Sequence, residues 1–220
     1  MATSNPARPT TPADARRRWG VSAGVAVLVI AIGVGLFALW RSSTSNASPD
    51  AAGGTPVYAV GQPGPGQIAP GFALASSSGG TVSLASLHGK TVLLYFQEGL
   101  TCQPCWDQIK DLERSSSAVH AAGIDQVLSI TTDPVDLLTQ KTGDEGLSTP
   151  VLSDPNMTVS RVYHANDYGM MGDSRDGHTF LLVDGQGRIV WRADYGGAPH
   201  YTMFVPVDRL LADLKAGRSS

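Results

Sequence analysis

TVLLYFQEGLTCQPC, residues 91–105, joins an apolar run to a pair of cysteines. The run at 91–96 is apolar without strict alternation, which is typical of a central strand buried on both faces. After the cysteines, residues 104–118 place apolar side chains three and four positions apart, which predicts an amphipathic helix. Pro104 suits the first turn of that helix, where no N–H is needed. The stretch therefore predicts a strand, a loop and a helix that begins at a dithiol.

Cys102 and Cys105 are the two cysteines of the 220-residue chain. The thiolate is the reactive form, and the N–H groups and dipole of a helix N-terminus stabilise it. We expect Cys102 exposed at the helix tip as the attacking sulfur, and Cys105 one turn in and shielded as the resolving sulfur. A metal-binding dithiol and a purely structural disulfide remain open alternatives.

Residues 19–40 are uncharged and long enough to cross a bilayer as a helix. Trp19 and Trp40 stand at the two ends, and arginines at 8, 16, 17 and 18 precede the segment. The positive-inside bias predicts a single-pass anchor in the cell membrane, with residues 1–18 as a disordered cytoplasmic N-terminus. A cleaved signal peptide, with Ser45-Asn46-Ala47 near the cut, is the alternative.

Residues 41–65 are rich in Ser, Ala, Gly and Pro and predict a flexible linker. Residues 66–217 suit one extracytoplasmic domain. Its predicted elements are a hairpin at 72–84, strands at 91–96 and 126–131, and helices at 134–140 and 157–164. Asp133 is a possible cap of the helix at 134–140, with Pro134 in its first turn. A hairpin at 179–192 and a helix at 205–216 follow. This order predicts an α/β fold with a mixed central sheet flanked by helices. The net charge of −3 argues against nucleic acid as a partner.

The domain carries an ordered series of motifs. They are APGFAL at 69–74, GTVSL at 80–84, GKTVLLYF at 89–96, the CQPC dithiol, Ser153-Asp154, and TFLLVDGQGRI at 179–189. In this order they resemble the thioredoxin superfamily, and within it the redoxin branch. That branch includes the peroxiredoxin-like AhpC/TSA proteins and the membrane-anchored TlpA/ResA-type thiol–disulfide oxidoreductases. The resemblance implies a thioredoxin-like fold and cysteine redox chemistry without a cofactor.

The chain departs from both branches at the dithiol. Thr101 precedes the first cysteine, where thioredoxin-like oxidoreductases usually carry Trp, and His178 takes the place of their cis-proline. We expect a trans bond at that position. With Cys105 aligned to the peroxide-reducing cysteine of Pro-x-x-x-Thr-x-x-Cys, Glu98 and Cys102 replace the proline and the threonine. With Cys102 aligned instead, Tyr95 and Gly99 stand at these positions, so neither alignment keeps the threonine hydroxyl. Arg175 is near the place of the peroxiredoxin arginine but displaced from it. Dithiol exchange is therefore favoured over thiol peroxidase activity, which stays as an alternative.

Two further residues are candidates for the site. Glu98 follows the central strand and is a candidate proton acceptor for Cys105, with a solvated loop carboxylate as the alternative. His178 is a candidate for shielding or tuning the Cys102 sulfur, with a surface or half-buried structural histidine as the alternative. Copper chaperones of the Sco family are also similar, so Cys102, Cys105 and His178 form an alternative copper site.

The sequence thus predicts a membrane-anchored extracytoplasmic thiol–disulfide oxidoreductase that uses a CxxC dithiol. Catalysis would rest on Cys102, Cys105, Glu98 and His178. The expected partners are extracytoplasmic protein thiols and disulfides, together with a membrane or extracytoplasmic redox partner. No cofactor is expected, with copper as the alternative.

Overall fold

A computed structural model describes residues 57–218 of the chain. The predicted cytoplasmic segment, the anchor at 19–40 and most of the predicted linker lie outside the described residues. Within 57–218, no helix combines the length and the apolar character that crossing a membrane requires.

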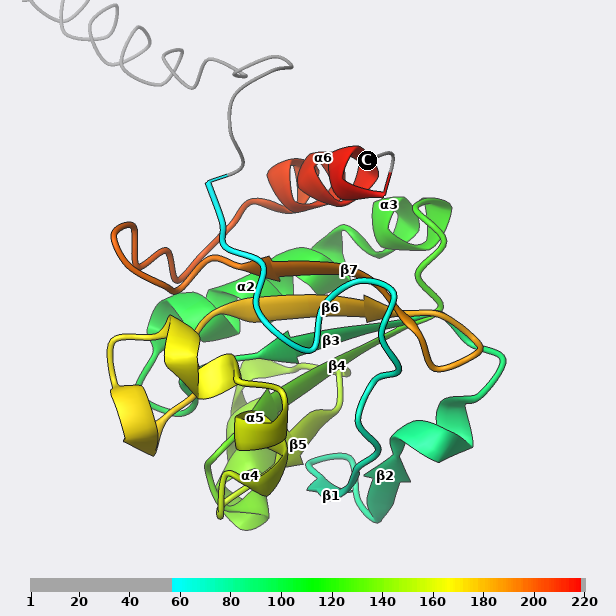
Figure 1. The fold of residues 1–220 in the computed structure, drawn as a ribbon. Helices are drawn as coiled ribbons and strands as arrows, with labels where there is room; N and C mark the ends of the chain where they lie inside the picture. The colour runs from blue at the N-terminus through cyan, green and yellow to red at the C-terminus, as the bar shows by residue number, and fades with distance from the viewer. Residues whose placement is uncertain (1–56, 219–220) are drawn as a thin grey trace, which may run out of the picture. The chain divides into compact units, whose positions relative to one another are not determined.

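One mixed sheet of seven strands organises these residues, in the order β2-β1-β5-β4-β3-β6-β7 (Figure 1). The strands are β1 (Ala73–Ser76), β2 (Thr81–Ser83), β3 (Val92–Phe96), β4 (Gln126–Thr131), β5 (Val151–Ser153), β6 (Thr179–Val183) and β7 (Ile189–Asp194). β3 pairs with β4 in parallel and with β6 antiparallel. The predicted central strand is therefore confirmed, and so are the two predicted hairpins, β1–β2 and β6–β7.

Side chains of β3 alternate between two hydrophobic cores, one on each face of the sheet. Leu93 and Tyr95 enter the core that the long helices cover, whereas Leu94 and Phe96 enter the opposite core beneath α5. The helices are α2 (Gln103–Arg114), α3 (Ser116–Ala121), α4 (Val135–Glu145), α5 (Thr158–Val162) and α6 (Val207–Gly217), with 3-10 turns η1 (Leu84–Leu87), η2 (Ala165–Tyr168) and η3 (Gly172–Ser174). Burial on both faces explains why β3 is apolar throughout.

Several element predictions need correction. The helix predicted over 104–118 is two helices, because α2 ends at the C-cap Ser115 and α3 starts afresh. That break falls in a serine run, and serine is a weak helix former that competes for backbone hydrogen bonds. The short strand β5 was not predicted. α4 extends beyond the predicted residue 140 to Glu145, and Pro134 occupies its N-cap position without a side-chain cap.

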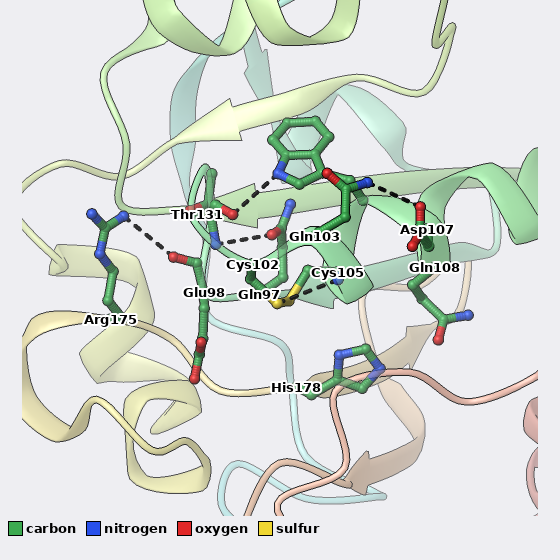
Figure 2. Close-up of a disulfide and its surroundings, with 12 residues drawn as sticks. Gln97, Glu98, Cys102, Gln103, Cys105, Asp107, Gln108, Thr131, Arg175 and His178 are labelled. Atoms are coloured by element: carbon green, nitrogen blue, oxygen red, sulfur yellow. Dashed lines mark hydrogen bonds between the residues drawn. A yellow bond between two sulfur atoms is a disulfide. The ribbon is translucent and has the colours of Figure 1, made fainter. Parts of the chain in front are cut away.

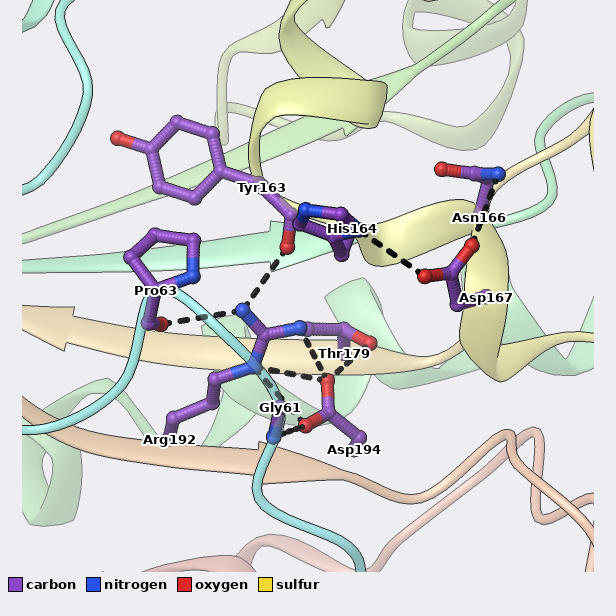
Figure 3. Close-up of polar contacts among 9 residues, drawn as sticks. All are labelled: Gly61, Pro63, Tyr163, His164, Asn166, Asp167, Thr179, Arg192 and Asp194. Carbon is purple, nitrogen blue, oxygen red and sulfur yellow. Dashed lines mark hydrogen bonds and ion pairs between the residues drawn. The ribbon is translucent and has the colours of Figure 1, made fainter.

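The predicted flexible linker is wrong for its last part, residues 57–65, which pack against β7. Ala59 forms an antiparallel bridge with Asp194, and the Gly61 N–H donates to the Asp194 carboxylate at 2.7 Å. Arg192 pairs with Asp194, and both side chains are fully buried. Arg192 also donates to the Pro63 carbonyl at 3.1 Å (Figure 3). The sheet therefore fixes this segment through a buried ion pair that lies far along the sequence.

Candidate active site

The two cysteines form a disulfide at the start of α2, with their Cα atoms 5.3 Å apart. Cys102 is the N-cap residue, and its sulfur accepts the Cys105 N–H at 3.3 Å. This contact places the positive end of the helix dipole at the Cys102 sulfur, where it would stabilise a thiolate. The predicted position of the dithiol at a helix start is confirmed.

The burial of the two sulfur-bearing residues follows the predicted order but not the predicted extent. Cys102 is 7% exposed and Cys105 is 0% exposed. The expectation of an openly exposed Cys102 is therefore wrong. Cys102 nevertheless keeps the only surface access of the pair.

The loop 97–102 is held by backbone and side-chain hydrogen bonds, and Leu100 in it packs against the core that contains Tyr95. The Gln97 side-chain oxygen accepts the Gly99 N–H at 2.9 Å, and an Asp133 carboxylate oxygen accepts the Leu100 N–H at 2.7 Å. The Gly99 carbonyl accepts the Trp106 indole N–H at 3.1 Å (Figure 2). These bonds connect β3, the start of α2 and the end of β4.

Gly99 permits this arrangement because it has a φ of +96° and no side chain. A Cβ atom at this position would lie 1.8 Å from the Asp133 Oδ2 atom. Asp133 is therefore part of the loop support and not the cap of α4, which corrects that prediction.

Arg175, which follows η3, bridges the loop 97–102 and the end of β4. Its guanidinium pairs with Asp133 and donates to the Glu98 carbonyl at 3.2 Å (Figure 2). Spacing along the chain did not indicate this role, because Arg175 and Asp133 lie 42 residues apart. The arginine that seemed displaced in the sequence therefore reaches the backbone of the active-site loop.

Glu98 is 8% exposed, so the alternative of a solvated loop carboxylate is wrong. Its Oε1 atom is buried and has no hydrogen-bond partner. The Glu98 charge helps to raise the pKa of Tyr95, behind the larger effect of burial. Its role as a proton acceptor for Cys105 therefore stays a prediction, one that a buried carboxyl group suits.

His178 precedes β6 and is fully buried, so the alternative of a surface or half-buried histidine is wrong. Its Nδ1 atom lies 2.9 Å from the Tyr95 hydroxyl, and its Nε2 atom has no partner. Burial lowers the pKa of His178 to about 3, so the ring is neutral at neutral pH. The bond before His178 is not among the cis peptide bonds of residues 57–218, which agrees with the predicted trans bond.

The alternative copper site was tested against the same geometry. Across residues 57–218, no three His, Cys, Asp or Glu side chains are arranged so that they could hold a metal ion. Cys102, Cys105 and His178 therefore do not form such a group in this disulfide-bonded structure.

Comparisons with known proteins identify the family of the chain. The AhpC/TSA family model matches residues 65–192. The Mycobacterium tuberculosis protein named "Putative peroxiredoxin Rv2521" is 33% identical over 131 residues, which cover 57% of this chain and 82% of that protein. The Haemophilus influenzae protein named "Putative peroxiredoxin bcp" is 32% identical over 110 residues, covering 50% of this chain and 67% of that protein.

Solved structures support the fold. Peroxidoxin BcpB from Mycobacterium tuberculosis matches with a TM-score of 0.58 and 20% identity, over 69% of this chain and 96% of that chain. Enterococcus faecalis AhpC matches with a TM-score of 0.59 and 15% identity, over 70% and 92% of the two chains. The described residues thus have a thioredoxin-like α/β fold. With its dithiol at a helix start and its match over 65–192, the chain belongs to the AhpC/TSA family and is a peroxiredoxin-like thiol oxidoreductase.

Proposed function

We propose that this enzyme is anchored in the cell membrane and exchanges thiols and disulfides with extracytoplasmic proteins. The observation that carries the proposal is the sulfur pair itself. Cys102 and Cys105 are bonded at a helix start, and only Cys102 retains surface access. A partner can therefore reach one sulfur, while the other is held in place to resolve the intermediate.

In the reducing direction, the Cys102 thiolate attacks one sulfur of a substrate disulfide. The substrate S–S bond breaks, a Cys102–substrate disulfide forms, and the second substrate sulfur leaves as a thiolate. The Cys105 thiolate then attacks the Cys102 sulfur, which releases the first substrate sulfur and closes the Cys102–Cys105 bond. Two electrons pass from the cysteine pair to the substrate, and the reverse sequence oxidises a substrate dithiol.

Glu98 is the proposed proton acceptor for Cys105. Its carboxylate is buried near the dithiol and its Oε1 atom has no partner, so it is free to receive a proton from the resolving thiol. Deprotonation of Cys105 is needed because only the thiolate attacks the mixed disulfide. His178 is the proposed tuning residue on the same side of the dithiol (Figure 2).

The membrane location rests on the sequence of residues 19–40 and on the arginines that precede them. An oxidising compartment outside the cytoplasm suits a dithiol that cycles through a disulfide. A membrane or extracytoplasmic redox partner would restore the cysteine pair after each turnover, because the exchange leaves it in the opposite redox state.

The test is a trapping experiment with the full chain in cells. A Cys105→Ser variant lacks the resolving sulfur, so mixed disulfides through Cys102 should accumulate and identify extracytoplasmic partners. The control variant, Cys102→Ser with Cys105→Ser, should trap nothing. Absence of adducts from the single variant would contradict the exchange function, whereas adducts confined to cytoplasmic proteins would contradict the proposed location.

Peroxide reduction is the second candidate, and family membership favours it. In this reaction the Cys105 thiolate attacks one peroxide oxygen and the O–O bond breaks. A sulfenic acid forms on Cys105, and the other oxygen takes up a proton and leaves as water or an alcohol. Cys102 then condenses with the sulfenic acid, which forms the disulfide and releases water. The two cysteines would exchange the roles described above.

Hydrogen peroxide distinguishes the two candidates. A peroxidase should lose its free thiols to peroxide far faster than free cysteine does, and Cys102→Ser should keep this rapid oxidation at Cys105. An exchange enzyme should oxidise with peroxide about as slowly as free cysteine and react rapidly with a protein disulfide. Rapid peroxide oxidation that depends on Cys105 would make peroxide reduction the primary function.

A further inference from the structure

Trp106 follows the second cysteine and holds the residues at the start of α2 at two points. Its indole N–H donates to the Gly99 carbonyl at 3.1 Å, and its backbone N–H donates to the Cys102 carbonyl at 3.4 Å. Trp106 is 0% exposed and packs in the core that the long helices cover. The Lys141 ammonium of α4 also lies over its ring, 5.5 Å from the centroid. The indole is therefore fixed by its surroundings and can in turn fix the loop.

The two carbonyls that Trp106 holds also shape the turn that presents Cys102. The Cys102 N–H donates to the Gly99 carbonyl at 3.0 Å, and the Cys105 N–H donates to the Cys102 carbonyl at 3.1 Å. Two consecutive turns therefore meet at Cys102, and the first of them spans 99–102. Gly99 is buried, and its carbonyl oxygen accepts two hydrogen bonds, one from the turn and one from the indole. Loss of the indole N–H would leave this buried acceptor with one bond fewer.

We propose that Trp106 is a positioning residue that keeps the turn 99–102 in one conformation through the redox cycle, so that α2 keeps its first turn when the disulfide opens. None of these four hydrogen bonds has a sulfur atom as donor or acceptor. Breaking the S–S bond therefore removes none of them. The Cys102 sulfur then stays beside the Cys105 N–H, at the positive end of the helix dipole. This inference rests on the proposed exchange function and adds a residue to it.

A turn held in this way assists both steps of the exchange. In the first step, the Cys102 thiolate stays stabilised by the helix start while it attacks the substrate disulfide. In the second step, Cys105 stays in the same helical turn, because its N–H remains bonded to the Cys102 carbonyl. The resolving sulfur is then close to the mixed disulfide before it reacts, and proximity of this kind accelerates the attack.

The first test compares the two redox states of the unsubstituted full chain, purified in detergent. Amide hydrogen exchange is measured by mass spectrometry on peptides that cover residues 97–106. We expect these amides to be protected in the disulfide form and to exchange less than about tenfold faster after reduction, because their hydrogen bonds remain. Exchange that becomes about tenfold faster or more on reduction would mean that the turn opens with the disulfide, and would overturn the proposal.

The second test removes the indole N–H. Trp106→Phe keeps a buried aromatic ring but has no donor for the Gly99 carbonyl. The amides of 97–106 should then exchange at least about tenfold faster in both redox states. The pKa of the Cys102 thiol should rise toward the ordinary value of about 8.5, because the sulfur is no longer held at the helix start. The reaction of Cys102 with oxidised glutathione should slow about tenfold.

The matched control is Trp191→Phe. Trp191 of β7 is buried in the same core, but its indole nitrogen has no hydrogen-bond partner among the described residues. This variant loses the same side-chain volume without losing a hydrogen bond. It should therefore unfold at a lower urea concentration, yet keep the amide protection of 97–106, the Cys102 pKa and the rate with oxidised glutathione.

An unchanged amide protection or an unchanged Cys102 pKa in Trp106→Phe would contradict the proposal, and so would equal changes in Trp191→Phe. If Trp106→Phe does not fold, the comparison of the two redox states of the unsubstituted chain still decides. Amide protection and thiol pKa need no protein substrate, so they also separate this inference from the proposed function. A chain that shows both predicted effects and traps no protein partner retains the Trp106 role and loses the exchange function.

Discussion

The Arg192–Asp194 pair and the surroundings of the disulfide are both buried and polar. Their polar groups differ in how completely they are hydrogen-bonded. Each nitrogen of the Arg192 guanidinium has an acceptor, and both Asp194 oxygens accept at least two hydrogen bonds (Figure 3). Around the disulfide, by contrast, the described side chains of Glu98, Gln108 and His178 each retain a buried atom without a partner.

This difference separates a region that holds the fold from one that changes state. A fully satisfied buried network is rigid, whereas unpaired buried groups are unfavourable unless another state pairs them. Opening the disulfide creates new charge and new acceptors, and the Arg192–Asp194 region has no such event to accommodate. The comparison predicts that substitutions in the first region alter stability, while substitutions around the disulfide alter the redox reaction.

Asp194→Ala should produce the largest loss of stability. It leaves the buried Arg192 guanidinium without its carboxylate, which costs about 3–5 kcal/mol in buried pairs. The free energy of unfolding by urea measures this loss. The control is Asp167→Ala, which removes a half-exposed partner of His164 and should cost about 0–1 kcal/mol. Similar losses in the two variants would refute the structural role of the buried pair.

Gly99→Ala should lower both the stability of the fold and the rate of the redox reaction. The new Cβ meets the Asp133 carboxylate and forces a side chain into a left-handed conformation, with a combined cost of about 2–4 kcal/mol. Displacement of Asp133 also frees the Leu100 N–H, so we expect exchange with a protein disulfide to slow about tenfold.

The matched control for this substitution is Gly89→Ala. Gly89 has a φ of +87°, but a Cβ there meets nothing within 4 Å. It should therefore cost only the conformational strain of about 1 kcal/mol and leave the exchange rate unchanged. An exchange rate in Gly99→Ala equal to that of the control would show that the loop contacts do not position Cys102.

Asp176 makes a smaller, pH-dependent contribution to the free energy of unfolding. The Ser160 hydroxyl lies 2.7 Å from an Asp154 oxygen and 3.0 Å from an Asp176 oxygen, and its single proton serves only one of them. Burial raises the pKa of Asp176 to about 8, so this carboxyl group is protonated at neutral pH. Because the folded state holds a proton that the unfolded state releases, this contribution is complete at low pH and is lost as pH rises through 8.

The Asp176→Asn variant keeps the shape of the neutral acid without its titration. From pH 6 to pH 8 its unfolding free energy should rise by about 2 kcal/mol relative to the unsubstituted chain. Urea unfolding at the two pH values measures the difference. Parallel pH dependence in the two proteins would mean that Asp176 is ionised in the fold.

The elements next to the dithiol were predictable because their signals are local. The apolar run of β3 and the proline after Cys102 both indicate structure within a few residues, and both predictions are confirmed. The break at Ser115 was missed because serine only weakens a helix and does not forbid it. The length of the linker was misjudged because its packing depends on Asp194, far along the sequence.

The supporting residues of the site could not be predicted for a similar reason. Glu98 and His178 were named, but their burial depends on β6 and on the loop that carries Arg175. Asp133 was predicted as a helix cap because it stands next to α4 in the sequence. Its carboxylate instead accepts the Leu100 N–H, which lies 33 residues away and gives no local signal. Tyr95 looked like a core residue, and only the fold brings its hydroxyl to His178.

The most direct test of the account is the order in which the two thiols react. The reduced full chain is treated with a limiting amount of an alkylating agent over a range of pH, and the label on each cysteine is quantified by mass spectrometry. We predict that Cys102 reacts at least about tenfold faster than Cys105, with a thiol pKa well below the ordinary value of about 8.5. Faster labelling of Cys105, or a Cys102 pKa at or above about 8.5, would contradict a helix-start nucleophile with a shielded resolving partner.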